Sequence, residues 1–302
     1  MPCSSGPPTT SFILTMRLQH IHQDILLYIL SHANMESLLC LAQTSSTLRF
    51  LIKKFFLSRW RQELSKYFLP PTETRMWMRY LHIVASGSSA LRQVLPNTTE
   101  WQNNDLDFYC PQKNTAPCLE FLFKQGYHVI CSEEPLPPDD STSPLPYHGP
   151  GILAVIPLQH PGQKKIDVVI STNDNALLPI ATFWGSVVQN YMAADSFAIA
   201  YPRNTLKRIG YIAPDRAHLA KTVRCVQKYH TRGFTILEYD TVIHQGYCPA
   251  QLRSFDDEHT LRFSFTDPPH YYEPQFHYWR LKLRCPCEGQ TVLPTPEVHS
   301  NN

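Results

Sequence analysis

Two aspartates separated by one residue, with a third much later in the chain, are the groups in this sequence best suited to chemistry. Asp105 and Asp107 alternate with the apolar residues Leu106 and Phe108, and Asp167 lies inside another apolar run. Because alternate residues of a strand share a face, the spacing predicts that Asp105 and Asp107 point the same way. If the strand of Asp167 lies alongside, three carboxylates converge, and such like charges repel strongly unless a cation joins them. Oxygen ligands of this kind suit Mg²⁺, which also takes substrate phosphates, so the three aspartates are predicted as catalytic residues and magnesium ligands.

A Gly-Ser sequence precedes the first of these aspartates. Gly87 follows the apolar run 83–85, which predicts a strand, and Ser88 and Ser89 are suited to cap a helix over 90–95. The start of a helix offers N–H groups without partners and a partial positive charge, which favour a phosphate. Gly87, Ser88 and Ser89 are therefore candidate nucleotide-binding residues. The alternative is that they form a turn and a helix cap and nothing more.

The elements that must position these residues follow from the pattern of apolar residues. The runs 152–158 and 166–170 predict a hairpin that brings Asp167 into a sheet, and 116–125 predicts an amphipathic helix. The segments 176–184 and 216–230 also have helical patterns. The second is basic, and helical spacing places Lys221, Arg224 and Lys228 on one face. That face could approach the phosphates of a nucleotide, or it could simply be solvated.

The order Gly-Ser, short helix, Asp-x-Asp and distant Asp resembles the nucleotidyltransferase fold of the polymerase-beta-like superfamily. The chain looks most like a group of basidiomycete fungal proteins that share the motifs Gly87-Ser88, Ala90-Leu91, Leu95-Pro96 and Asn104–Tyr109. The resemblance spans residue 83 to the end of the chain. It implies that Asp105, Asp107 and Asp167 hold Mg²⁺ and that Gly87 and Ser88 hold a nucleoside triphosphate. No acceptor can be read from the sequence, and many members of this superfamily have no assigned activity.

The N-terminal part resembles a second family, the F-box. Apolar residues at helical spacing over residues 18–56 predict short helices joined by tight turns, with a longer helix that begins near Ser45. F-boxes dock on the Skp-type adaptor of cullin ubiquitin ligases, and the resemblance implies a set of docking residues here: Ile21, Asp24, Ile25, Leu26, Ile29, Leu38 and Leu41. His22 stands where F-boxes usually carry proline. The alternative is a helical cap that packs on its own domain and binds no partner.

Composition limits the remaining functions. The chain has 302 residues, 43% of them hydrophobic, and a net charge of +2, which suits a folded protein with a substantial core. Lysine and arginine are scattered over the whole chain, so no basic stripe indicates a face for duplex nucleic acid, although a local cleft can still be positive. The nine cysteines show no disulfide framework, and no run reaches the length of a signal peptide or a membrane span. A cytoplasmic or nuclear protein that does not bind membranes is expected.

The sequence thus predicts an α+β protein in which an F-box-like helical module precedes a nucleotidyltransferase-like mixed sheet with flanking helices. The expected segments are a flexible leader, the helical module, connecting helices, the α+β domain and a disordered tail, with these bounds: 1–15, 16–60, 61–82, 83–288 and 289–302. Three functions remain open. The first is an F-box-like adaptor whose second domain serves recognition or nucleotide binding, the second is a magnesium-dependent nucleotidyltransferase, and the third is a non-catalytic scaffold.

Overall fold

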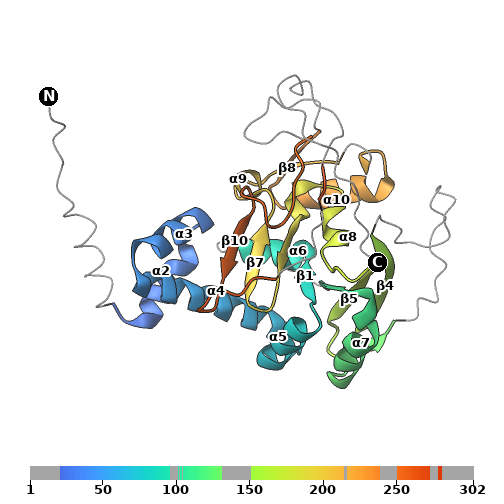
Figure 1. Ribbon diagram of the computed structural model, residues 1–302, viewed down its shortest axis with the longest axis horizontal. Coiled ribbons are helices and arrows are strands. Elements are labelled where there is room, and N and C mark those ends of the chain that lie inside the picture. The colour runs from blue at the N-terminus through green and yellow to red at the C-terminus, as the bar shows by residue number, and fades with distance from the viewer. Residues whose placement is uncertain are drawn as a thin grey trace.

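The computed structural model is a mixed α+β fold in which N-terminal helices precede an eight-stranded mixed sheet (Figure 1). This agrees with the predicted fold class at the level of its architecture. The structure describes residues 21–95, 101, 103, 105–130, 151–213, 216–238, 250–272 and 278–280. The predicted leader 1–15 and tail 289–302 lie outside the described residues.

Four helices form the N-terminal part: α2 (Gln23–His32), α3 (Met35–Thr44), α4 (Ser46–Lys66) and α5 (Pro71–Tyr80). Side-chain caps start three of them, and at the start of α2 the His22 side chain accepts a hydrogen bond from the Asp24 N–H at 3.4 Å. Asn34 accepts a hydrogen bond from the Ser37 N–H at 2.8 Å at the start of α3, and Ser45 accepts one from the Leu48 N–H at 3.2 Å at the start of α4. The prediction of a long helix beginning near Ser45 is confirmed. This helix continues through residue 60, where the helical module was expected to end.

The main sheet has the strand order β10-β7-β6-β1-β2-β5-β4-β3. Its strands are β1 (Val84–Ser86), β2 (Asp105–Cys110), β3 (His128–Val129), β4 (Ile152–Gln159), β5 (Lys165–Ser171), β6 (Asn190–Met192), β7 (Ser196–Ile199) and β10 (Leu261–Ser264). The predicted hairpin is confirmed as the antiparallel pair β4/β5. β2 and β5 run parallel to each other, whereas the other described neighbours in this sheet are antiparallel.

Shorter helices and a second sheet complete the fold. The helices are α6 (Gly87–Val94), α7 (Thr115–Lys124), α8 (Leu178–Ala181), α9 (Pro202–Thr205) and α10 (Ala220–His230), with 3-10 turns at Gln112–Asn114 and Ser186–Val188. Two parallel strands, β8 (Ile209–Tyr211) and β9 (Thr235–Leu237), form the second sheet.

Two helix predictions were too long. Only Leu178–Ala181 of the segment 176–184 is α-helical, and side chains satisfy backbone groups at both of its ends. The Asn175 side chain accepts from the Leu177 N–H at 2.9 Å, and the Gln189 amide donates to the Ala181 carbonyl at 2.8 Å. The helix predicted from residue 216 begins at Ala220.

An aromatic cluster joins α4 to the sheet. The ring of Phe56 on α4 lies 5.2 Å from that of Phe197 on β7 and 5.3 Å from that of Phe263 on β10, centroid to centroid. Phe56 and Phe197 are almost fully buried. Edge-to-face pairs of this kind stabilise beyond their buried area. The N-terminal helices and the sheet therefore share one hydrophobic core.

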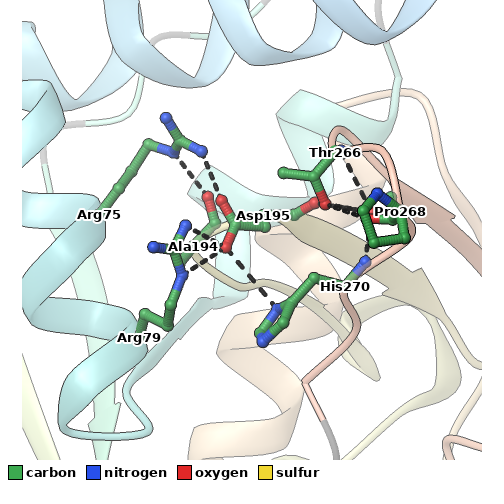
Figure 2. Close-up of polar contacts among 8 residues, drawn as sticks. Arg75, Arg79, Ala194, Asp195, Thr266, Pro268 and His270 are labelled. Carbon is green, nitrogen blue, oxygen red and sulfur yellow. Dashed lines mark hydrogen bonds and ion pairs between the residues drawn. The ribbon is translucent and has the colours of Figure 1, made fainter.

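A buried carboxylate adds a polar connection between the same parts (Figure 2). Asp195, in the turn between β6 and β7, is 1% exposed and contacts Arg75 at 2.5 Å and Arg79 at 2.5 Å, both from α5. The Nδ1 atom of His270, from the segment after β10, lies 3.7 Å from the same carboxylate. Nearby, Lys53 of α4 donates to the Thr266 carbonyl at 2.8 Å. The segment after β10 thus joins α4 to the sheet, and Asp195 joins α5 to it.

Candidate functional site

The two aspartates of β2 lie on the accessible face of their strand. Asp105 and Asp107 are partly exposed, whereas Leu106 and Phe108, which alternate with them, are fully buried on the opposite face. This alternation is the one that the sequence predicts for a strand with a single buried face. The prediction that both carboxylates point to the same side of the sheet is therefore confirmed.

The register of the sheet brings the third aspartate beside them. Asp107 on β2 is directly opposite Asp167 on the parallel strand β5, and Asp105 is opposite Lys165. On its other side, Asp107 is opposite Ser86, the residue before the Gly-Ser turn. Neighbouring strands are about 4.8 Å apart, so the side chains of Asp107 and Asp167 start from adjacent points of one face. The expected juxtaposition of the turn and the aspartates is present.

Three carboxylates this close together disfavour one another's ionised form when no cation lies between them. Burial, followed by the charges of Asp105 and Asp167, raises the pKa of Asp107 to about 8, while Lys228 and Lys221 act in the opposite direction. The pKa of Asp167 is also raised, chiefly by burial and then by Asp105. Negative charges that raise one another's pKa values in this way are relieved by a cation.

Gly87 leaves the space that the Asp107 carboxylate occupies. It has φ +68, a backbone conformation that side chains other than glycine rarely adopt, and it is the first residue of α6. A Cβ atom at this position would collide with the carboxylate of Asp107. Two features therefore favour glycine here, the backbone conformation of the turn and the close approach of the Asp107 side chain.

The two serines of the turn are already engaged. Ser89 is 1% exposed and donates a hydrogen bond to the Asp105 carbonyl at 2.9 Å, so it holds α6 against β2. The hydroxyl of Ser88 lies 3.1 Å from the Tyr229 hydroxyl and accepts a hydrogen bond from Arg232 Nη1 at 2.7 Å. The structure thus brings both serines to the site, but their hydroxyls bind protein groups.

Tyr229 and Arg232 are site residues that the motif analysis missed. Tyr229 lies in α10 and is buried, and Arg232 follows that helix and packs over the rings of Trp101 and Tyr229, with its guanidinium carbon 5.2 and 5.3 Å from the centroids. The basic helical pattern of 216–232 was the available signal. It did not show that the helix folds back over a turn about 140 residues earlier.

The donor set fits magnesium by its chemistry. Three aspartates from two adjacent strands supply oxygen ligands, and burial, followed by their mutual charges, raises the pKa values of Asp107 and Asp167. Within the described part of the chain, however, no three His, Cys, Asp or Glu side chains are arranged closely enough to hold one metal ion. Side-chain rotation of the aspartates would therefore accompany metal binding.

The residues predicted to dock a partner fall into two groups. Leu26 and Leu38 are 4% and 0% exposed and belong to the core, so as the helices stand they do not reach a partner. Ile25 and Ile29 are 56% and 46% exposed, Asp24 is exposed, and Ile21 and Leu41 are partly buried. The structure adds Tyr28, 67% exposed, which shares a face of α2 with Ile25 and Ile29.

Across the described residues we find no helix that combines the length and the apolar character needed for a membrane span. Comparison of the chain with protein-family models, with curated proteins and with solved structures found no match in any of the three.

Proposed function

We propose that the aspartate site binds a nucleoside triphosphate with Mg²⁺ and transfers its nucleotidyl group to the hydroxyl of an acceptor, with pyrophosphate as the leaving group. The observation that supports this most is the register of β2 and β5, which sets Asp107 beside Asp167 and next to the turn at Gly87. Phosphoryl-transfer sites need positioned carboxylates and a place for phosphates, and here both occur on one face of the sheet. The resemblance of the motifs to nucleotidyltransferases leads to the same proposal.

In this proposal each group has a separate role. Asp105, Asp107 and Asp167 hold Mg²⁺, which when bound neutralises the charge of the carboxylates and of the phosphates. Gly87, which has no side chain, lets the N–H groups at the start of α6 face a phosphate. Alternatively, Asp105 and Asp107 hold the ion and Asp167 accepts the proton of the attacking hydroxyl, a role that suits the raised pKa that burial and Asp105 give its carboxyl group.

The test is nucleotide binding by the full chain, measured by calorimetry with each of the common nucleoside triphosphates in Mg²⁺ and in EDTA. We expect binding that requires Mg²⁺ and is lost in Asp105→Asn/Asp107→Asn. Asp174→Asn is the matched control, because Asp174 is an exposed carboxylate beyond the far end of β5 that pairs with Lys113. Equal binding by the double variant and by the control would reject the proposed site.

A second candidate function, docking on a Skp-type adaptor, is supported by the exposed apolar face of α2. Ile25, Tyr28 and Ile29 expose about half or more of their surface, although α2 buries Leu26 and Leu30 on its other side. Exposed apolar residues grouped on one helix face are typical of a protein interface. In this proposal the aspartate domain recognises the target or binds a nucleotide.

Co-purification of the full chain with a Skp-type adaptor tests this second function. We expect capture of the adaptor and its loss in Ile25→Ser/Ile29→Ser. The control is Met76→Ser/Tyr80→Ser, which removes two large side chains of α5 that are at least as exposed as Ile25 and Ile29. Capture that survives the α2 change, or fails in both variants, would contradict docking through α2. A non-catalytic scaffold, the third hypothesis, predicts neither magnesium-dependent nucleotide binding nor adaptor capture.

A further inference from the structure

The first aspartate of β2 lies beyond the end of the neighbouring strand β1. The ladder between the two strands stops at the pair Ser86 and Asp107, because the chain leaves β1 at Gly87 and enters α6. The described register pairs Asp105 with Lys165 of β5 and with no residue of β1. The backbone of Asp105 on the side of β1 therefore needs a hydrogen-bond partner from outside the sheet, because a buried carbonyl without one is costly.

Two hydroxyl groups supply this partner. The carbonyl oxygen of Asp105 accepts a hydrogen bond from the Tyr67 hydroxyl at 2.8 Å and one from the Ser89 hydroxyl at 2.9 Å. The Tyr67 hydroxyl also lies 3.4 Å from the carbonyl oxygen of Asn103. Ser89 belongs to the Gly-Ser turn, whereas Tyr67 belongs to the N-terminal helices. The two parts of the chain thus meet at the backbone of this aspartate.

Tyr67 is itself held in place by its surroundings. It ends α4, where its N–H donates to the Leu64 carbonyl at 3.0 Å, and its side chain is 1% exposed. Its own carbonyl accepts a hydrogen bond from the Tyr127 hydroxyl at 2.6 Å. Burial raises the pKa of Tyr67 above its usual range, so the hydroxyl stays protonated and remains a donor.

A metal ligand at the end of a strand needs such support. Asp105 is the first residue of β2, and the ends of elements are the parts of a fold that open most readily. A group that binds a metal must be held within about 0.5 Å of its productive position. Outer groups that orient the ligands typically account for about 10–100-fold in metal affinity.

We propose that Tyr67 is a positioning residue of the aspartate site, whose hydroxyl fixes the backbone of Asp105 and so places that carboxylate for a divalent cation. The part of this inference that concerns the cation rests on the proposed function, whereas the fixing of the backbone does not. The N-terminal helices therefore supply a group of the site. A domain that began at residue 83, as the sequence predicts, would lack it.

The experiment compares the full chain with Tyr67→Phe in two measurements. The first is deuterium exchange of the amides of β2 in EDTA. The second is binding of Mn²⁺, which takes the same oxygen ligands as Mg²⁺ and is detected by electron paramagnetic resonance. The variant leaves the Asp105 carbonyl with the donor Ser89, so this carbonyl does not lose its last partner. We expect exchange at the start of β2 to be about threefold to tenfold faster and Mn²⁺ binding to be about tenfold weaker or more.

Tyr127→Phe is the matched control. It removes a similarly buried hydroxyl that bonds the carbonyl of Tyr67 rather than that of Asp105. It should lose stability in urea as Tyr67→Phe does, while exchange at β2 and Mn²⁺ binding stay close to those of the unchanged protein.

The two measurements separate the outcomes. Exchange at β2 that Tyr67→Phe leaves unchanged, or that both variants accelerate equally, would overturn the positioning role. Faster exchange with unchanged Mn²⁺ affinity would overturn the connection to the cation. If the unchanged protein binds neither Mn²⁺ nor a nucleoside triphosphate in Mg²⁺, the proposed function fails, and the exchange measurement alone decides whether Tyr67 fixes Asp105.

Discussion

The guanidinium of Arg75 lies 2.5 Å from the carboxylate of Asp195, a residue 120 positions later in the chain. This ion pair joins α5 to the turn between β6 and β7. The Nε atom of Arg79 donates a hydrogen bond to the second oxygen of the same carboxylate at 2.7 Å (Figure 2). Asp195 is almost completely removed from solvent, so its charge depends on these partners. The N-terminal helices are thus fixed to the sheet by a polar contact as well as by their shared core.

Asp195→Asn should destabilise the whole protein. The change keeps the shape of the side chain but leaves the buried arginine Arg75 without its counter-charge, which costs about 3–5 kcal/mol in the free energy of unfolding. Urea unfolding followed by circular dichroism measures it. Asp24→Asn, at a carboxylate that is 83% exposed, is the control and should change stability little. A similar small effect in both variants would show that the buried ion pair contributes no more than a surface one.

Gly87→Ala should remove magnesium-dependent nucleotide binding and lower stability. The new Cβ would be held at φ +68 and would collide with the Asp107 carboxylate. A left-handed backbone costs a residue other than glycine roughly 1–2 kcal/mol before any collision. Calorimetry and urea unfolding measure the two effects. Gly126→Ala is the matched control, because Gly126 also has positive φ but has only the His160 side chain near its Cβ position. It should lose stability while keeping nucleotide binding; loss of binding in both would point to general unfolding.

Asp107→Asn should raise the melting temperature by a few degrees in EDTA. Burial and the charges of Asp105 and Asp167 disfavour the Asp107 carboxylate, as its pKa of about 8 indicates, and the amide removes that penalty. The order should reverse in Mg²⁺, because a bound ion stabilises the unchanged protein and not the variant. Thermal unfolding with and without Mg²⁺ provides the measurement. A variant that melts lower in EDTA would mean that the carboxylate is already stabilised without a metal.

The Arg253–Asp257 pair should give the protein a pH-dependent stability at acid pH. Burial acts to raise the pKa of Asp257, but hydrogen bonds from Arg253 and from the Ser254 N–H outweigh it and lower that pKa below 3.8. A carboxyl whose pKa is lower in the folded state stabilises the fold above its unfolded pKa and loses this contribution as pH falls through the folded value. The stability difference between the unchanged protein and Asp257→Asn should thus be constant near neutrality and shrink below about pH 4.

Unfolding midpoints across that pH range measure the difference. Glu258→Gln alters a neighbouring carboxylate that is 87% exposed, and it should show no such dependence. A difference between the unchanged protein and Asp257→Asn that persists undiminished at the lowest pH would contradict the assigned role of this pair.

Local patterns were enough to predict the strand that carries Asp105 and Asp107. Alternating apolar and acidic residues predict a strand with one buried face. In the structure Leu106 and Phe108 are the buried residues of this alternation. The apolar run around Asp167 likewise predicts a strand buried in a sheet, but its pairing with the strand of Asp107 was only a condition, because local patterns do not decide which strands become neighbours. These inferences depend on residues close together in sequence.

Contacts between distant segments could not be predicted in this way. Nothing in the residues around Ser88 indicates that Tyr229 and Arg232 will approach it, because that contact depends on how α10 returns to the sheet. The same holds for the division of the N-terminal helices into buried and exposed residues. Leu26 and Ile25 are adjacent and both apolar, and only the packing of α2 on its neighbours decides which of them is exposed.

The aromatic contact between α4 and β10 has a consequence during synthesis on the ribosome. Phe56 emerges about 200 residues before Phe263 and Phe265, which complete its surroundings. At 5–20 residues per second the ring waits about 10–40 s for these partners. Over that interval the nascent helix exposes an apolar face of the type that chaperones bind. This face stays prone to aggregation until translation reaches the last strand of the sheet.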